Sequence, residues 1–287
     1  MRPDADAWWP APAKINLFLH VVGRRVDGYH LLQTVFQFVD LCDELRFTPR
    51  ADGEIHLLKP LPGVAPEQDL CVRAARALQV RTGCRAGADI EVVKRIPMGG
   101  GLGGGSSDAA TTLLVLDRLW GLDLPRAELA TLGLTLGADV PVFIGGRAAL
   151  AQGVGEQLTP VEPAELGEPW YLIVDPGVAV ATARVFADPK LTRNTPPMTI
   201  SDLRSGPVRN DCLPVARALY PQVDAAYRWL SDFGEARLSG TGGCLFARFE
   251  ARTAADQVLA QLPAPWRGWV VRGLNHHPLH ALLAAHD

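Results

Sequence analysis

The stretch PMGGGLGGGSSDAA, from Pro97 to Ala110, decides the fold because it joins a strand-like segment (88–96) to a helix-like one (106–120). Glycine is needed where backbone amides approach phosphate oxygens closely and where the chain adopts conformations that other residues avoid. The amides and partial positive charge at the start of a helix then stabilise an anion. We therefore predict a phosphate-binding loop followed by a helix, capped by Ser106, Ser107 and Asp108 and ended by Gly121.

Other interpretations of this loop are weaker. A Walker loop would close with Gly-Lys-Ser or Gly-Lys-Thr, which this stretch lacks. The loop does contain G-x-G-x-x-G at Gly99, Gly101 and Gly104, but a dinucleotide site would place this motif after the first strand, with an acid after the second. A flexible surface loop rarely leads directly into a well-capped helix. The pattern favours a nucleotide-dependent kinase over an oxidoreductase.

Outward from the loop, the pattern predicts an α+β fold with two domains. Strands are expected at 14–22, 31–47, 88–96, 170–177, 244–249 and 268–274, and helices at 69–82, 106–120, 126–136, 223–233 and 253–262. The Pro- and Glu-containing stretch 159–169 separates an ATP-binding domain, 1–160, from a substrate-side domain, 161–287.

Composition limits the function classes. The formal net charge is −3, and no cluster of Lys and Arg is present to neutralise a phosphate backbone, so nucleic acid is not an expected partner. Residues 1–13 lack a long apolar core, and no later segment is long enough to span a bilayer, so we expect a cytoplasmic protein. The five cysteines are scattered without a C-x-x-C pair, which favours reduced thiols over disulfides or zinc. We expect a small-molecule substrate and a monomer or homodimer.

Four blocks of the sequence resemble the GHMP kinase superfamily: PAKINLFLHVVGRRVDGYHLLQTVFQFVDL, PMGGGLGGGSSDAA, LGLTLGADVPVFIGGRAALAQGVGE and SGTGGCLFARF. Together they resemble the branch that acts on a diphosphocytidyl derivative of methylerythritol in the non-mevalonate isoprenoid pathway. The resemblance implies the two-domain GHMP architecture, with ATP on the glycine loop and the acceptor in the interdomain cleft. It implies phosphorylation of the acceptor's 2-hydroxyl, giving the 2-phosphate and ADP.

Asp139 is the candidate catalytic base, because a carboxylate between Gly137 and Pro141 in an apolar stretch is poorly explained by solubility. Its alternative role is a helix cap before Pro141. By the resemblance, Lys14 would keep Asp139 ionised and lower the cost of forming the alkoxide. The alternative is a solvated lysine just before a strand, which is the more common role of a lysine at such a position.

The resemblance also assigns a substrate site. Asn16, Tyr29 and His30 would contact the substrate, with Phe186 on the other face of the cytosine from Tyr29 and Thr182 as a weaker candidate. The alternatives are a plain turn at DGYH and a core position for Phe186. The turn SGTGGC, 239–244, would close the active site near the transferred phosphate.

For ATP, the resemblance assigns the loop and two residues that come before it in the chain: Asp69, Lys94, Pro97, Met98, Gly99, Gly100, Gly101, Leu102, Gly103, Gly104, Gly105, Ser106 and Ser107. Asp69 departs from the family, which often has Asn there, and this puts the hydrogen-bond pattern to adenine in question. Mg²⁺ is expected with ATP. Its protein ligands are unassigned, since capping explains Ser107 and Asp108 equally well.

Three other functions stay open at this point. They are a GHMP kinase for homoserine or mevalonate, a nicotinamide-dependent oxidoreductase, and a noncatalytic nucleotide-binding protein.

Overall fold

The computed structural model describes residues 7–205 and 208–285. The strands are β1 (Trp9–Arg24), β2 (His30–Arg50), β3 (Ile55–Leu57), β4 (Gly87–Val93), β5 (Ala149–Gln152), β6 (Gln157–Pro160), β7 (Trp170–Asp175), β8 (Arg237–Leu238), β9 (Leu245–Phe249) and β10 (Arg267–Leu274). The helices are α1 (Leu70–Thr82), α2 (Gly104–Trp120), α3 (Arg126–Leu134), α4 (Val140–Gly145), α5 (Pro163–Leu166), α6 (Thr182–Ala187), α7 (Asp202–Ser205), α8 (Leu213–Leu219), α9 (Pro221–Ser231), α10 (Arg252–Leu259) and α11 (Pro278–Ala285), with a 3₁₀ helix at Pro66–Gln68. The predicted α+β class and the predicted segments are confirmed within a few residues.

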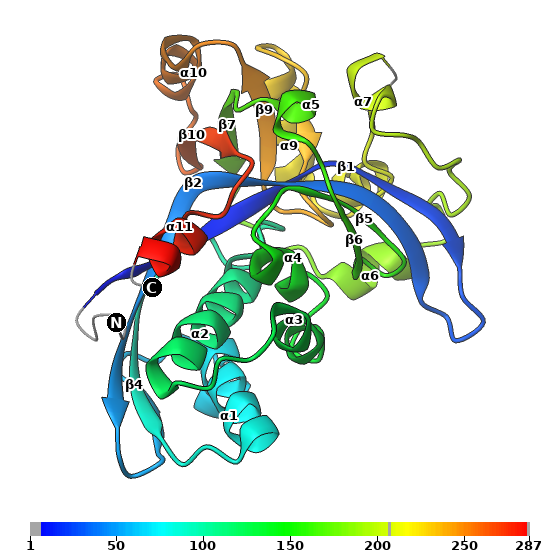
Figure 1. Ribbon diagram of the computed structural model, residues 1–287. Coiled ribbons are helices and arrows are strands. Elements are labelled where there is room, and N and C mark those ends of the chain that lie inside the picture. The colour runs from blue at the N-terminus through cyan, green and yellow to red at the C-terminus, as the bar shows by residue number, and fades with distance from the viewer. Residues whose placement is uncertain (1–6, 206–207, 286–287) are drawn as a thin grey trace.

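A long antiparallel hairpin, β1 with β2, forms the centre of the molecule. The strands run in the order β3-β4-β2-β10-β7-β9-β8, while β1 and β5 also pair with β2, and β6 pairs with β5. Figure 1 shows the hairpin passing between helices α1 to α4 on one side and the strands β7, β9 and β10 on the other. The hairpin therefore contributes residues to both halves of the molecule.

Both faces of β1 are buried, which explains why its sequence lacks a strict alternation of apolar and polar residues. Trp9 and Ala11 belong to the core that includes α1, α2 and α4, whereas Ala13, Ile15 and Leu17 belong to the core that includes β7, β9 and β10. Irregularities in the pairing with β2 interrupt β1, one of them between Asn16 and Leu19. Such bulges re-aim side chains, and here the irregularity lies beside the polar residues Lys14 and Asn16.

Helix α2 begins earlier than we predicted. Its N-cap is Gly103, in the left-handed conformation (φ 73°), and no side chain caps it. Ser106, Ser107 and Asp108 lie inside its first turns, so their predicted capping role is wrong. The predicted stop is confirmed, because Gly121 (φ 66°) ends the helix in the left-handed conformation. Glycine adopts these backbone angles without strain, so Gly103 can start the helix, and Gly104 and Gly105 form its first residues.

The second half of the chain forms its own core, in which α8 and α9 pack on β7 and β9 together with the end of β1. The final helix returns to the first half, where Leu279 and Leu283 join the core around α2. The strand before it, β10, pairs with β2 through Gly273 and Leu274. A division at 160/161 remains our proposal for the domain boundary. Within the described residues, no helix is long and apolar enough to cross a membrane.

Candidate active site

Two cavities adjoin at the glycine-rich loop. The larger, of about 810 Å³, lies between the β1–β2 hairpin, the residue before α4 and helix α6. The smaller, of about 430 Å³, lies between the loop and the start of α1. Gly101 and Gly103 belong to the walls of both cavities. A phosphate chain held by the loop would therefore lie at the border between them.

Lys14, on β1, lies at this border with its side chain almost fully buried (3% exposed). Its Nζ donates to Asn16 Oδ1 at 2.7 Å and to the carbonyl of Gly101 at 3.1 Å, and it lies 3.1 Å from Asp139 Oδ2. A lysine ammonium has three protons, so these three oxygens account for all of them. The contacts place the cation in a fixed position beneath the loop, and the alternative of a solvated lysine is wrong.

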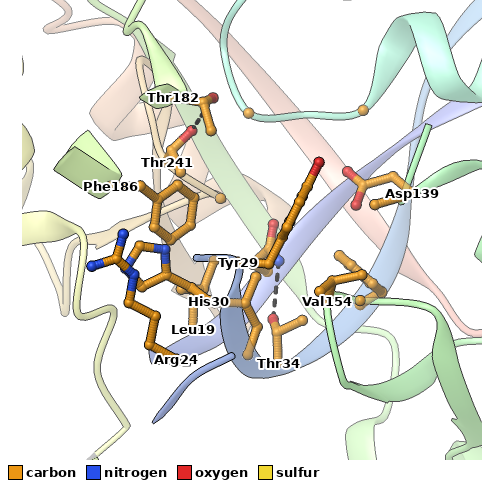
Figure 2. A pocket seen from close by; sticks show the side chains of 18 of the residues that line it. Leu19, Arg24, Tyr29, His30, Thr34, Asp139, Val154, Thr182, Phe186 and Thr241 are labelled. Atoms are coloured by element: carbon orange, nitrogen blue, oxygen red, sulfur yellow. Dashed lines mark hydrogen bonds between the residues drawn. The ribbon is translucent and has the colours of Figure 1, made fainter. Parts of the chain in front are cut away.

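Asp139 is the residue before α4, and its side chain is 31% exposed. It occupies the N-cap position of α4, as the alternative role requires, but its side chain makes no capping hydrogen bond. Its carboxylate instead pairs with Lys14 and lines the larger cavity. Figure 2 shows Asp139 across this cavity from Thr182 and Phe186.

The two glycine-rich segments are packed against each other. The hydroxyl of Ser239 donates to the carbonyl of Gly101 at 2.9 Å, and the amide of Cys244 donates to the carbonyl of Gly100 at 3.0 Å. A Cβ at Gly101 would lie 2.1 Å from the carbonyl oxygen of Ser239, closer than any side chain tolerates. The turn 239–244 thus supports the loop from behind, and it also places Gly240 and Thr241 in the wall of the larger cavity.

Lys94 and Asp69 line the smaller cavity, but their polar groups already bind other parts of the protein. Asp69 accepts from the amides of Cys71 and Val72, which makes it the N-cap of α1. The ammonium of Lys94 binds both Asp43 and Asp108. These contacts supply structural roles that the sequence did not reveal. The predicted contacts with adenine remain predictions.

The predicted loop residues lie together around the smaller cavity, with one exception. Its wall includes Pro97 to Ser106, whereas the side chain of Ser107 is fully buried and is absent from the wall residues of both cavities. Asp108 belongs to the wall, and its Oδ1 has no hydrogen-bond partner among the described residues. Burial raises the pKa of Asp108 to about 8, against the lowering effect of Lys94.

All five substrate-side candidates line the larger cavity: Asn16, Tyr29, His30, Thr182 and Phe186. The side chain of Tyr29 is exposed (66%), whereas Asn16 is buried and donates to Thr34 Oγ1 at 2.9 Å. The ring that stacks on Phe186 is that of His30, with centroids 4.9 Å apart and planes 25° apart. Figure 2 shows this pair on one side of the cavity and Tyr29 standing apart from it.

Sequence reasoning missed further residues at this site. Arg24, in the block GRRVDGYH, lines the larger cavity, and Arg193 binds His30 from behind. The position of Arg24 next to the DGYH turn was a usable signal. Arg193 lies in a segment without periodic pattern between α6 and α7, where no local signal marks it.

Comparison with known proteins identifies the family of this chain. The model of the GHMP kinases N-terminal domain matches residues 69–147, and that of the GHMP kinases C-terminal domain matches residues 201–268. The 4-diphosphocytidyl-2-C-methyl-D-erythritol kinase of Nitrosococcus oceani is 59% identical over 268 residues, covering 93% of this chain and 95% of the relative. The kinase of the same name from Halorhodospira halophila is 55% identical over 276 residues, covering 96% of each chain.

Solved structures of kinases also resemble this chain. A crystal structure of 4-(cytidine 5'-diphospho)-2C-methyl-D-erythritol kinase superposes with a TM-score of 0.81 at 34% identity, covering 93% of this chain and 99% of that one. A mevalonate kinase superposes with a TM-score of 0.69 at 17% identity, covering 94% of this chain and all of that one. The second likeness concerns the fold alone.

Proposed function

Since this chain belongs to the 4-diphosphocytidyl-2-C-methyl-D-erythritol kinases of the GHMP kinase family, we propose that its smaller cavity binds ATP and its larger cavity binds the diphosphocytidyl substrate. The chain is a phosphotransferase with an alcohol as acceptor, and its reaction gives the 2-phosphate and ADP. We assign the two cavities from their position at the glycine-rich loop, because Gly101 and Gly103 lie in the walls of both cavities.

Asp139 and Lys14 are the proposed catalytic residues. The carboxylate takes the proton of the 2-hydroxyl as its oxygen attacks the γ-phosphorus and the bond to the β-phosphate oxygen of ADP breaks. The Lys14 cation, 3.1 Å from Asp139, stabilises negative charge that develops on the attacking oxygen. Asn16 and the Gly101 carbonyl hold that cation in place, so it is preorganised before the substrate binds.

The loop is the proposed phosphate site, with its amides and the start of α2 as the anion-binding groups. Positive φ values at Gly99, Gly101 and Gly103 (71°, 77° and 73°) are consistent with a loop built for close approach. The proposed ATP contacts of Asp69 and Lys94 would have to be made in addition to the internal contacts that these side chains already have.

Magnesium is the proposed partner of ATP, and one residue here fits it. Asp108 lies in the wall of the smaller cavity, and its buried Oδ1 has no partner among the described residues. Burial raises the pKa of this carboxyl to about 8, and a bound cation would favour its ionised form. Mg²⁺ in kinases is commonly held by one or two carboxylates together with phosphate oxygens and waters, so a single protein carboxylate is sufficient. The bound ion would neutralise charge on the phosphates. Ser107 lies in the wall of neither cavity, which argues against it as the ligand.

The cytidine end of the substrate is proposed to lie among Tyr29, His30 and Phe186, with Thr182 beside them. Aromatic rings and an imidazole suit stacking and polar recognition of a base. We also propose that the protein binds small molecules only and that it is located in the cytoplasm, where ATP is present. We propose that it is a monomer or a homodimer.

The observation that supports this function best is the ion pair of Lys14 and Asp139 in the wall of the larger cavity, where Lys14 also binds the carbonyl of Gly101, a residue of both walls. An ADP-release assay with the diphosphocytidyl substrate, mevalonate and homoserine tests it. We expect turnover with the diphosphocytidyl substrate alone. Turnover with mevalonate or homoserine in its place would contradict the assignment of the larger cavity.

A further inference from the structure

Arg193 connects three parts of the proposed cytidine site. Its Nε donates to His30 Nε2 at 3.1 Å, and its Nη2 donates to the carbonyls of Phe186 and Asp188 at 2.9 and 2.8 Å. Its Nη1 donates to the carbonyl of Leu191 at 3.0 Å. Four of the five guanidinium protons are therefore used inside the protein. One side chain thus holds the His30 ring, the end of α6 and the segment that follows it.

The contact with Arg193 determines which nitrogen of His30 carries the proton. A guanidinium only donates hydrogen bonds, so Nε2 of His30 must accept and must be unprotonated. The proton of the neutral ring is then on Nδ1. Burial lowers the pKa of His30, and the positive charges of Arg193 and Arg24 act in the same direction, so the ring is neutral near pH 7.

The same arginine also places the ring. His30 stacks on Phe186 with centroids 4.9 Å apart, and Arg193 binds both the His30 ring and the Phe186 backbone. Without Arg193, the His30 ring and the Phe186 backbone would no longer be held by the same side chain, and the two rings could move independently of each other. Position and tautomer of His30 therefore depend on one residue outside the cavity wall.

Building on the proposed function, we infer that Arg193 is a positioning and specificity residue, which presents His30 as a fixed N–H donor to the cytosine of the substrate. The N3 of cytosine is a hydrogen-bond acceptor, whereas the N3 of uracil carries a proton and opposes a second donor. A site with a fixed donor rejects a base that offers another donor, because both groups would be left unpaired. Arg193 therefore helps the enzyme to distinguish the cytidine substrate from its uridine analogue, although it acts through His30 and contacts neither substrate.

The first test uses the native protein without substrate. Nitrogen-15 NMR of histidine-labelled protein distinguishes the Nδ1–H from the Nε2–H tautomer. We expect His30 to be the Nδ1–H tautomer, and to lose that preference in Arg193→Met. A native His30 with its proton on Nε2 would overturn the inference whatever the enzyme's activity.

The second test measures KM and kcat for the diphosphocytidyl substrate and its uridine analogue. In Arg193→Met we expect KM for the cytidine substrate to rise roughly ten- to a hundredfold, as for loss of a charged hydrogen bond, with kcat changing much less. The preference for cytidine over uridine should fall toward equality. Arg193→Lys, which keeps the charge and one donor, should recover part of both.

Arg217→Met is the matched control, because Arg217 also makes side-chain contacts in the second half of the chain, with Asp224 at 2.7 Å, but lies outside both cavity walls. It should leave KM and base preference unchanged. An Arg193→Met variant that binds ATP normally and keeps native KM and base preference would refute the inference. Absence of turnover by the native enzyme would instead contradict the proposed function, and the tautomer measurement would still test Arg193.

Discussion

Lys14 Nζ and Asp139 Oδ2 lie 3.1 Å apart, although one residue is on the first strand and the other precedes a helix that comes after the phosphate loop. The lysine is almost fully buried and the carboxylate is partly exposed to the larger cavity. This arrangement buries the cation and leaves the carboxylate, which we propose as the base, open to a substrate hydroxyl. It suits phosphoryl transfer, in which positioning and electrostatic stabilisation supply most of the catalysis.

Lys14→Met should reduce turnover strongly while weakening nucleotide binding only modestly. Methionine keeps the apolar stem that packs under Gly103 but removes the charge next to Asp139. Turnover at saturating ATP and the ATP affinity from calorimetry check this. Should ATP binding vanish while chemistry at saturation survives, Lys14 would be a nucleotide anchor instead.

Gly103→Val should damage both ATP binding and turnover. A Cβ at Gly103 would lie 3.0 Å from Lys14 Cε and 3.1 Å from Phe143 Cζ, and φ there is +73°, which a branched residue resists. Gly121→Val is the matched control, since φ is +66° at the other end of the same helix and nothing lies within 4 Å of a Cβ. Titration of folded variants with ATP compares them. Equal ATP affinity in both variants would remove the loop as the phosphate site.

Tyr29→Ala and Phe186→Ala should each raise KM for the diphosphocytidyl substrate and leave KM for ATP almost unchanged. Stacking of a base on an aromatic ring contributes about 1–3 kcal/mol, so each loss should weaken binding roughly five- to a hundredfold. Steady-state kinetics with each substrate varied in turn provide the measurement.

A substrate cut down to methylerythritol phosphate should react poorly even with the native enzyme, because remote binding energy orients the hydroxyl. Equal efficiency with the truncated and the full substrate would mean that the cytidine site is wrongly placed.

The pH dependence of substrate binding should follow His30. Burial first, and then Arg193 and Arg24, lower its pKa from the ordinary 6.5, so the neutral ring persists to a lower pH. KM for the diphosphocytidyl substrate should therefore stay constant as the pH falls past 6.5 and rise only when it passes the lowered pKa. His30→Asn, which does not titrate, should lack this rise. A KM that rises in His30→Asn at the same pH as in the native enzyme would assign the effect to another group.

Much of the fold could be predicted because its signals are local. The apolar runs of β1 and β2 and the glycine stretch between β4 and α2 are marked by their own residues. The start of α2 was misplaced for a physical reason. Capping statistics favour Ser and Asp, whereas here Gly103 turns the chain through a left-handed conformation and no side chain is needed.

The rest of the site depends on contacts between distant segments. The resemblance assigned Lys94 to ATP. Its partners Asp43 and Asp108 are brought to it by the pairing of β2 with β4 and by the docking of α2. Arg193 carries no local pattern, and its role follows only from the fold, which brings it to the side of His30. Sequence alone named many residues of the cavity walls, although it missed Arg24 and included Ser107, and it did not name Arg193, which holds His30.

The central claim is that Asp139 takes the proton from the 2-hydroxyl at the border of the two cavities. Single-turnover rapid quench of Asp139→Asn, with ATP and the diphosphocytidyl substrate both saturating, tests it most directly. We predict unchanged ATP affinity and a rate of ADP and 2-phosphate formation lower by roughly two to four orders of magnitude, the usual contribution of a positioned acid or base. A near-native rate in this variant would contradict the claim and remove Asp139 from the mechanism.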